Sequence, residues 1–313
     1  MRRNKKNIAV TGAQGFIGQA LVNVLLQSGD TVLPIVRTKR KSNDIAIGNI
    51  GLDTDWSSVL VDVDCIVHVA ARAHIMNDTS AEPLAEFRRV NVEGTLKLAQ
   101  QAVQAGVRRL VFLSSIGVNG NVTMHPFKET DTPRPADFYA ISKYEAEQAL
   151  LDLASCSSLE VVIIRPPLVY GPNAPGNFGK LLRLVKKGIP LPLGAINNKR
   201  SFVALNNLVD LIVTCINHPA AANQTFLAGD GEDLSTTELL SRLGEVLGIP
   251  ARLVPVPVGL LNFAASLLAK KDIAQKLCGS LQVDISKARE LLGWEPPLSV
   301  EKGLREVIED VKK

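Results

Sequence analysis

Cysteine and histidine are scarce in this sequence, and neither is arranged for metal binding. The 4 cysteines among 313 residues stand far apart, at positions 65, 156, 215 and 278, in apolar surroundings and without metal-ligand spacing. We therefore expect buried thiols in the reducing cytoplasm, and no bound metal. The 4 histidines are equally scattered, and His68, which ends an apolar run, is expected to be a hydrogen-bonded core residue.

Strong charge and long apolar runs are also missing. The net charge of +4 is small and the basic run at residues 2–6 is expected to be a solvated surface, so we expect no nucleic acid as a partner. The most apolar late stretch, residues 253–269, contains Pro255 and Pro257 and is too short to span a bilayer. Glycines interrupt the apolar segment behind the N-terminal basic run, so we expect neither a signal peptide nor a membrane span.

What the sequence does have is a glycine-rich turn near its start, NIAVTGAQGFIG at residues 7–18. A short apolar run ends at Thr11, glycines follow at 12, 15 and 18, and a helical apolar pattern begins at Phe16. Glycines at these positions permit a tight turn, the approach of a pyrophosphate to bare backbone, and close packing of helix on strand. The N–H groups of the helix N-terminus then favour an anion. The turn therefore predicts a dinucleotide site.

The order of the apolar segments predicts the fold class. Up to about residue 165, expected strands at 31–36, 45–50, 64–69, 110–113 and 161–164 alternate with expected helices at 16–27, 81–105 and 137–155. Such alternation is typical of an α/β fold of the Rossmann type, a doubly wound parallel sheet with helices on both faces.

The alternation of expected strands and helices ends near residue 165, and residues 166–194 are rich in proline and glycine. Helical periods recur at 176–188, 206–217, 235–247, 258–270 and 299–311, and short strands are expected at 201–204, 224–227 and 252–255. We expect residues 1–165, rejoined by about 205–222, to form an NAD(P)-binding domain. Residues 166–313 would form mainly a smaller C-terminal α/β lobe over the carboxyl edge of the sheet, where such sheets bind ligands.

Three polar residues form a candidate catalytic set. Tyr139 and Lys143 stand four apart near the start of an expected helix, so their side chains share a face. Ser115 follows the strand at 110–113, whose end opens onto the same crevice as the glycine turn. A phenol has a pKa of about 10 in water, and a neighbouring ammonium lowers it. The set therefore suits proton transfer by the phenol while the serine hydroxyl holds the reacting oxygen.

Several motifs together resemble the extended short-chain dehydrogenase/reductases, which are nucleotide-sugar epimerases, dehydratases and reductases. They are TGAQGFIG at 11–18, HVAA at 68–71, NVEGT at 91–95, SSIGVNG at 114–120, YAISK at 139–143, RPPLVYGP at 165–172 and DISKARELLGW at 284–294. The likeness extends over nearly the whole chain. It is nearest to UDP-hexose 4-epimerases and to 4-ketoreductases of the UDP-N-acetylquinovosamine type, which serve surface-polysaccharide synthesis.

The resemblance implies roles for individual residues. Ser115, Tyr139 and Lys143 correspond to the catalytic serine, the proton-transfer tyrosine and the ribose-holding lysine, and Asn91 would help to order the site. Expected cofactor contacts are Gly12, Gly15, Phe16, Ile17, Gly18, Arg37, Asn49, Ala70, Ala71, Tyr139, Lys143 and Pro166. Expected substrate contacts are Ser115, Asn177 and Phe178, together with Arg200 as a guanidinium clamp on a diphosphate.

Within the family, dehydration is disfavoured. Nucleotide-sugar dehydratases carry an acidic pair just after the catalytic Ser/Thr, where this chain has Ile116 and Gly117, and Asn119 replaces a usual tyrosine. Hydride transfer at C4 of a UDP-sugar of the N-acetylhexosamine type remains. We expect 4-ketosugar reduction, with UDP-glucose or UDP-N-acetylglucosamine 4-epimerisation by a retained NAD as the alternative. A non-catalytic NAD(P)-binding regulator is a third possibility, but such relatives typically lose the Tyr/Lys pair.

The end of the strand at 31–36 bears on the cofactor. NAD-using 4-epimerases resembling this chain have an Asp there for the ribose hydroxyls, whereas this chain has Val36 followed by Arg37 and a basic run at 39–41. An arginine can pair with a 2′-phosphate, so we expect NADP(H) ahead of NAD(H), which favours a reductase. The resemblance also implies a homodimer, joined through the helices at 81–105 and 137–155.

Overall fold

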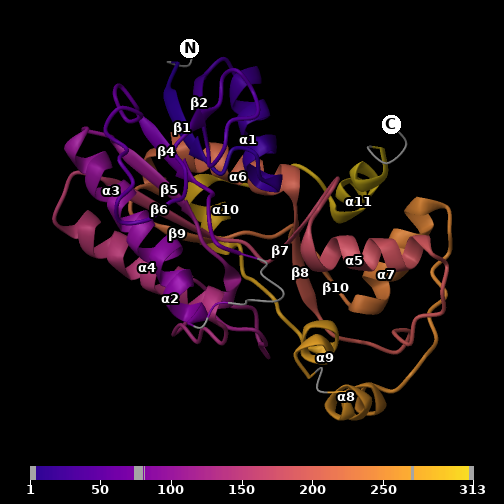
Figure 1. The fold of residues 1–313 in the computed structure, drawn as a ribbon. Helices are drawn as coiled ribbons and strands as arrows, with labels where there is room; N and C mark the ends of the chain where they lie inside the picture. Colours follow the sequence, from indigo (N-terminus) through magenta and orange to yellow (C-terminus); the bar gives the residue numbers. More distant parts are fainter. Residues whose placement is uncertain (1–4, 74–79, 81, 269–270, 310–313) are drawn as a thin grey trace.

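The centre of the molecule is a parallel sheet of seven strands in the order β3-β2-β1-β4-β5-β6-β9. The computed structural model describes residues 5–73, 80, 82–268 and 271–309 (Figure 1). The strands are β1 Asn7–Thr11, β2 Thr31–Val36, β3 Ile45–Ala46, β4 Cys65–His68, β5 Arg109–Leu113, β6 Glu160–Arg165 and β9 Thr225–Leu227. The strand order reverses between β1 and β4, which is where a doubly wound sheet opens a ligand crevice. The expected fold class is confirmed.

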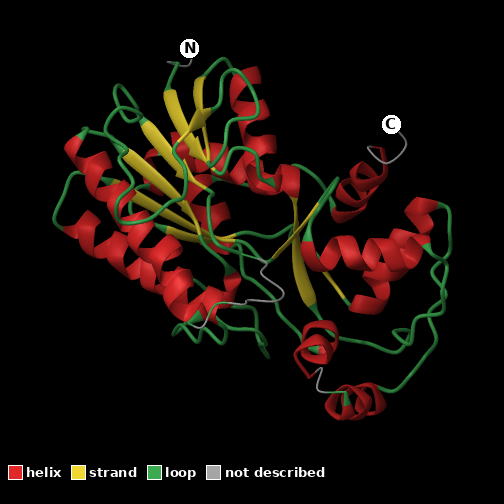
Figure 2. Ribbon diagram, viewed as in Figure 1, coloured by secondary structure: helices red, strands yellow, loops and turns green. Residues whose placement is uncertain are grey.

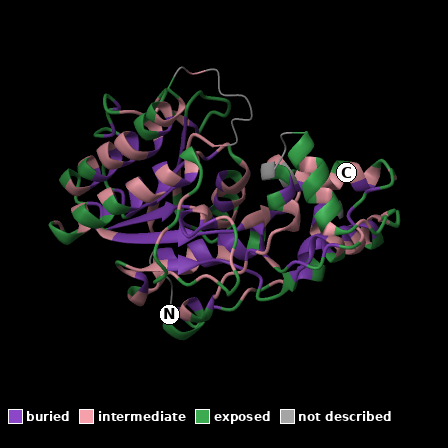
Figure 3. Ribbon diagram, turned by 90° about the horizontal axis from the view of Figure 1, so that it is seen from below, coloured by how far each residue is buried: buried purple, intermediate pink, exposed green. Residues whose placement is uncertain are grey.

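Helices cover both faces of this sheet (Figure 2). Ile8 and Val10 of β1 point into one core and Ala9 into the other, as the two-residue period of a strand requires. The first core includes residues of α1 Phe16–Gln27, α6 Leu205–Asn217 and α10 Ser286–Leu292. The second includes residues of α3 Gly94–Gln104 and α4 Phe138–Ser155, and the sheet lies buried between the two helical layers (Figure 3).

A smaller sheet, in the order β10-β8-β7, stands beside the first. Its strands are β7 Leu168–Tyr170, β8 Arg200–Ala204 and β10 Asp233–Leu234, and its helices are α5 Gly176–Lys186, α7 Thr236–Leu247, α8 Val258–Leu267, α9 Lys271–Cys278 and α11 Val300–Glu309. Two further cores lie here, one around Tyr170 and Phe178 and one around Val185 and Leu191. In the described part of the chain, no helix combines the length and apolarity needed to cross a bilayer.

Four expectations about elements or thiols are wrong. The strand at 252–255 is absent except for a single bridge between Leu253 and Leu191, because the nearby prolines offer no N–H for pairing. The third strand is only Ile45–Ala46. The long helix at 81–105 is divided into α2 Pro83–Arg88, a π-helical turn Arg89–Glu93 and α3. Cys65 and Cys215 are buried, but Cys156 is exposed.

Candidate active site

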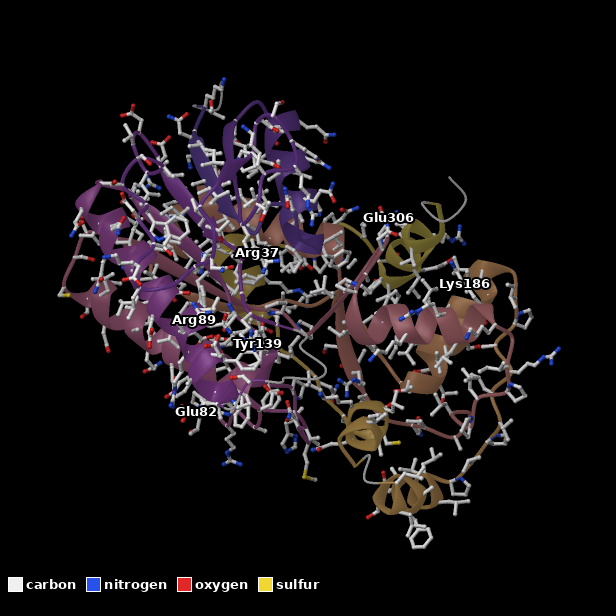
Figure 4. The ribbon with its side chains drawn as sticks, in the orientation of Figure 1. Arg37, Glu82, Arg89, Tyr139, Lys186 and Glu306 are labelled. Atoms are coloured by element: carbon white, nitrogen blue, oxygen red, sulfur yellow. The ribbon has the colours of Figure 1, made fainter. Side chains whose placement is uncertain are left out.

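A cavity of about 640 Å³ opens at the carboxyl ends of β1, β2, β4 and β5. The glycine turn and the Tyr139/Lys143 pair both line this cavity. Its lining includes these expected residues: Gly12, Gly15, Phe16, Ile17, Arg37, Asn49, Ala70, Ala71, Tyr139 and Lys143. Figure 4 labels Arg37, Arg89 and Tyr139, three lining residues that come from the end of β2, the π-helical turn and α4.

The glycine turn is shaped for close approach. Gly12 has φ +67°, and a Cβ there would lie 2.9 Å from the backbone nitrogen of Ala70. A Cβ on Gly18 would lie 2.2 Å from the Gly12 carbonyl oxygen, so Gly18 lets α1 pack on the turn. Gly18 does not line the cavity, and its expected place at the pyrophosphate stays a prediction. Gly15, at the N-cap of α1, offers no side-chain cap, and the first N–H groups of the helix remain for a ligand.

Buried hydrogen bonds fix the strand ends beneath this turn. His68 lies between two threonines, with Thr11 Oγ1 2.8 Å from its Nδ1 and Thr95 Oγ1 3.0 Å from its Nε2. Burial, with a smaller effect of the Lys143 charge, lowers the pKa of His68 to about 3, so the ring is neutral. The Thr11 hydroxyl also accepts the N–H of Ala70. His68 is thus the hydrogen-bonded core residue that the sequence predicts.

Asn91 holds the loop after β4. It lies in the π-helical turn, its Oδ1 accepts the N–H of Arg72 at 2.7 Å, and its Nδ2 donates to the Ser142 hydroxyl at 2.9 Å. A π-helical turn rotates a side chain away from its α-helical position and is frequent at functional sites. Asn91 therefore ties the cavity loop to α4, the helix that carries Tyr139 and Lys143.

Lys143 is the buried cation of the cavity. The residue is 1% exposed, its Nζ lies 4.1 Å from the centre of the Phe112 ring, and no hydrogen-bond acceptor contacts Nζ among the described residues. Burial lowers the pKa of Lys143 to about 7, although the Glu147 carboxylate opposes the change. An ammonium placed this way fits a ligand that brings hydroxyl or phosphate oxygens.

Tyr139 stands one helical turn before Lys143, at the start of α4. The Asp137 carboxylate caps this helix by accepting the Ala140 N–H at 2.8 Å. Burial raises the pKa of the Tyr139 phenol, and the charge of Asp137 raises it further. This is opposite to the lowering expected from Lys143, because in the protein alone the desolvation of the phenolate dominates.

Ser115 follows β5 and does not line the cavity. Its hydroxyl accepts the N–H of Gly117 at 3.1 Å, at the N-cap of the short 3-10 helix Ile116–Val118. A Cβ on Gly117 would lie 3.3 Å from Ser115 Oγ and 3.2 Å from Ala140 Cβ. Gly117, two residues after Ser115, is therefore the residue that packs against the first turn of α4, next to Ala140.

A buried ion pair that the sequence analysis missed supports α4 from behind. Glu147, one turn beyond Lys143, pairs with Arg165 at the end of β6, with Nη2 2.6 Å from Oε2. The Ser114 hydroxyl donates to the same carboxylate, and Arg165 Nη1 donates to Asn119 Oδ1 at 2.9 Å. Asn119, which replaces the usual tyrosine, is thus a buried part of this network.

The basic loop after β2 is fastened to the glycine turn. Asp44 Oδ2 accepts the N–H groups of Arg40 and Lys41 at 2.9 and 2.7 Å and the Gln14 amide at 2.8 Å. The N–H of Arg40, then that of Lys41, lowers the pKa of Asp44. Arg40 and Gln14 line the cavity with Arg37, and the analysis of the sequence identified neither as a contact.

Several expected contacts lie elsewhere. Phe178 is fully buried and packs on Tyr170 with ring centres 5.6 Å apart, so its ring is a core side chain. Pro166 is buried outside the cavity lining, and its carbonyl accepts the Ile116 N–H at 3.0 Å. Arg200 begins β8, also outside this lining, and donates to the Gly279 carbonyl at 2.9 Å. The side chain of Asn177 lies outside the described residues.

The residues of the cavity fit a nicotinamide dinucleotide. The bare backbone at Gly12 and Gly15 and the uncapped N-terminus of α1 suit a pyrophosphate, and the ammonium of Lys143 suits ribose hydroxyls. No group of three or more His, Cys, Asp or Glu side chains within the described ranges is placed to hold a metal ion.

Comparisons with known proteins agree with this site. The model of the NAD dependent epimerase/dehydratase family matches residues 8–229. The chain is 49% identical to a UDP-glucose 4-epimerase of Vibrio cholerae over 97% of this chain and 95% of that protein. It is 29% identical to a UDP-glucose 4-epimerase of Mycolicibacterium smegmatis over 96% of each. Among solved structures, MoeE5 in complex with UDP-glucuronic acid and NAD is similar at 26% identity and a TM-score of 0.79, covering 98% of this chain and 99% of that one.

Proposed function

Because this chain belongs to the NAD dependent epimerase/dehydratase family, we propose that it interconverts the C4 epimers of a UDP-sugar with a retained NAD. The observation that carries the proposal is the placement of Tyr139 and Lys143 in the same cavity as the dinucleotide turn. The likeness to UDP-glucose 4-epimerases supports the C4 reaction. It also shifts our preference from the 4-ketosugar reduction that the sequence alone favours to the epimerase alternative.

The cofactor would lie across the glycine turn. Gly12, Gly15 and the N-terminus of α1 would hold its pyrophosphate, Ala70 and Ala71 would flank a ribose, and Lys143 Nζ would donate to the ribose hydroxyls. When bound, NAD would supply the hydride acceptor and donor for sugar C4, and its positive ring would favour the phenolate form of the neighbouring tyrosine.

The protein's own groups would move the proton. Tyr139 Oη takes the proton of the C4 hydroxyl as that carbon is oxidised and gives it back on reduction. Lys143 stabilises the phenolate by its charge, and the Ser115 hydroxyl donates a hydrogen bond to the reacting oxygen. Arg200 stays our proposal for the substrate diphosphate, since only one of its N–H groups has an acceptor among the described residues.

A second candidate, NADP(H)-dependent reduction of a 4-ketosugar, is favoured by one observation. Arg37 and Arg40 both line the cavity, and the residue at the end of β2 is Val36, which cannot repel a 2′-phosphate. With NAD, the same guanidinium groups would contact the adenine face or solvent. The two candidates therefore differ in cofactor as well as in reaction.

The test is to incubate the purified protein, without added cofactor, with UDP-glucose, UDP-galactose and their N-acetylated counterparts, and to follow each by NMR. We expect one C4-epimeric pair to approach equilibrium from both sides. Absence of conversion without cofactor, together with stoichiometric NADPH consumption on a UDP-4-ketosugar, would establish the reductase instead.

Cofactor preference can be tested independently of the reaction, by titrating NAD(H) and NADP(H) into the wild type and into Arg37→Ala and comparing their affinities. The matched control is Lys39→Ala, an exposed neighbour that does not line the cavity. For the epimerase we expect tight NAD binding that changes little in either variant. A selective loss of NADP(H) affinity in Arg37→Ala, absent in the control, would support the second candidate.

A further inference from the structure

The loop at residues 37–44, which we call the β2 loop, forms one wall of the active-site cavity. It begins after β2 and ends before β3, and these two strands pair in parallel, so both ends of the loop are fixed to the sheet. Residues 47–50, which follow β3, line the cavity as well. The cavity-lining members of the β2 loop are Arg37, Thr38 and Arg40. The position of this loop is therefore part of the shape of the cavity.

The order of the strands places the β2 loop at the end of the cavity opposite to Tyr139 and Lys143. That order is β2-β1-β4-β5, the glycine turn follows β1, and Lys143 lies over the Phe112 ring of β5. Arg37 and Tyr139, both labelled in Figure 4, come from these two ends. A dinucleotide with its pyrophosphate on the glycine turn and its nicotinamide beside Tyr139 would therefore place its adenosine at the β2 loop.

Asp44 is the buried member of the β2 loop and holds the loop in place. Residues 37–43 are exposed, whereas Asp44 is 7% exposed and does not line the cavity. Its Oδ2 accepts the N–H groups of Arg40 and Lys41 at 2.9 and 2.7 Å and the Gln14 side-chain amide at 2.8 Å. One carboxylate oxygen thus fixes two points of the loop backbone and joins them to the glycine turn.

Gln14 supplies the connection from the glycine turn, of which it is a part. Its Nε2 donates to Asp44 Oδ2 and, at 3.2 Å, to the Thr38 carbonyl. Within the described ranges, no other side-chain hydrogen bond joins residues 37–44 to another part of the protein. We name the following contacts the Asp44 clasp: those of Asp44 with Arg40, Lys41 and Gln14, and that of Gln14 with Thr38.

The charge of the β2 loop favours such contacts. Its eight residues include four basic side chains and a single acidic one, that of Asp44. Like charges along a short exposed segment repel one another, and the Asp44 carboxylate is the opposite charge within the loop. The N–H of Arg40, then that of Lys41, lowers the pKa of Asp44, so the carboxylate is ionised at neutral pH. The bonds of the clasp are therefore charge-assisted and stronger than bonds between neutral groups.

We propose that the Asp44 clasp retains the cofactor by holding the β2 loop against its adenosine end. Opening this end of the cavity requires the β2 loop to move, and the clasp opposes that movement. The inference rests on the proposed function, since an epimerase keeps its NAD through many turnovers whereas a reductase exchanges its cofactor at each one. Asp44 and Gln14 act as positioning residues, because their contacts fix the loop that would meet the adenosine.

The experiment measures the release of labelled NAD from the full chain after excess unlabelled NAD is added. The test variants are Asp44→Ala, Gln14→Leu and the two combined, and the matched control is Asp53→Ala, at an exposed carboxylate outside the cavity lining. Release is measured without turnover, and circular dichroism checks that each variant is folded. A parallel chase with labelled NADP covers the second candidate cofactor, because both cofactors carry an adenosine.

We expect slow release of NAD from the wild type and release at least about tenfold faster from Asp44→Ala, because charge-assisted bonds from three donors are lost. Gln14→Leu should also accelerate release, since it removes both bonds from the glycine turn to the loop. The effect of the double variant should be smaller than the product of the two single effects, because both substitutions break the same contact. The control should match the wild type.

The outcomes separate the clasp from the proposed function. Slow release that is unchanged in Asp44→Ala would overturn the clasp and leave the proposed epimerase standing, and so would single effects that multiply in the double variant. Rapid release of both cofactors from the wild type would overturn the clasp and the retained NAD together. Slow release of NADP alone, accelerated in Asp44→Ala, would support the clasp and overturn the epimerase. If Asp44→Ala does not fold, Gln14→Leu decides, and unchanged release from it would overturn the clasp.

Discussion

At the scale of single residues, the buried ammonium of Lys143 links the stability of the protein to its chemistry. Its charge is desolvated, and it lies against an aromatic ring instead of an acceptor. The charged form is what a phenolate and ribose hydroxyls require, yet burial lowers its pKa from 10.5 to about 7. Function therefore places on the folded protein a charge that is unfavourable to bury.

This conflict predicts how stability depends on pH. Below about pH 7 both folded and unfolded chains hold the Lys143 proton, so the folded state carries the full cost of the buried charge. Between about 7 and 10.5 the unfolded chain holds the proton and the folded chain does not, so this contribution to stability rises with pH. Lys143→Met should therefore have a higher free energy of unfolding than the cofactor-free wild type. The difference between the two proteins should be largest at pH 6 and should shrink toward pH 10. Denaturant unfolding measures it.

The control for this prediction is Lys302→Met, at an exposed position of α11. Its effect on the free energy of unfolding should be small and nearly constant over the same pH range. A constant difference between wild type and Lys143→Met would contradict the lowered pKa of Lys143.

Tyr139→Phe removes the transferable proton and leaves the ring that contacts Phe87, whose centre lies 6.4 Å away. We predict that turnover of the UDP-sugar falls by about 100-fold or more, the size of a general acid–base contribution. Cofactor affinity, measured by fluorescence titration, should change by less than about twofold, since the phenol hydroxyl is one contact among many. Undiminished turnover would remove Tyr139 from the mechanism.

At the scale of secondary-structure elements, α4 is positioned by a buried charge pair. Removing one partner of such a pair leaves an uncompensated charge, which costs about 3–5 kcal/mol. We predict a destabilisation of this size for Arg165→Met, because Glu147 would lose its guanidinium partner. The double substitution with Glu147→Leu should recover much of it. Equilibrium unfolding of the three proteins tests this, and equal stability of the single variant and wild type would refute it.

The matched control is the exposed pair Arg305–Glu301 on α11, in which both side chains are about two-thirds exposed. Surface pairs of this kind contribute about 0–1 kcal/mol because water and salt screen them. Arg305→Met should therefore change the free energy of unfolding far less than Arg165→Met.

The elements that the sequence predicts well are those whose signals are local. The glycine turn and the strands β1, β2, β5 and β6 can be predicted from short apolar runs that are bounded by turn-forming residues. The spacing of Tyr139 and Lys143 is enough to predict that they share a helix face. Strands β7 and β10, with 3 and 2 residues, are too short to show a period. Their pairing depends on β8, far away in sequence.

Other features depend on tertiary packing and cannot be predicted from local pattern. Phe178 resembles a substrate contact by motif, but its ring fills the core against Tyr170. Gln14 and Arg40 line the cavity only because Asp44 folds the loop after β2 back on the glycine turn. Nothing in the sequence around Glu147 on α4 predicts that it pairs with Arg165, which ends β6.

At the scale of the whole molecule, we propose that residues 1–165, rejoined by about 205–222, form the cofactor-binding domain. Helix α6 packs in the first core, and β9 and α10 return to the same sheet. The remainder would form mainly the substrate-binding lobe, so that the cavity faces the second sheet. In this arrangement the cofactor-binding domain would hold the dinucleotide, and the substrate-binding lobe would hold the nucleotide-sugar.

We also propose a homodimer in which α3 and α4 of two copies form a four-helix interface. Leu151, an exposed apolar residue of α4, should lie within it. Sedimentation velocity at micromolar concentration should show a dimer for the wild type and dissociation for Leu151→Arg, but not for Leu291→Arg on α10, an equally exposed leucine. A wild type that stays monomeric would remove this interface.

The most direct test of the central claim follows one hydride. The protein is incubated with UDP-glucose deuterated at C4, without added cofactor, and the products are examined by NMR and mass spectrometry. If NAD is retained, the hydride removed from C4 would return to the same sugar, so we predict UDP-galactose with deuterium still at C4. Loss of deuterium from C4 to solvent or to released cofactor, or no epimer from any UDP-sugar of the panel, would contradict the account.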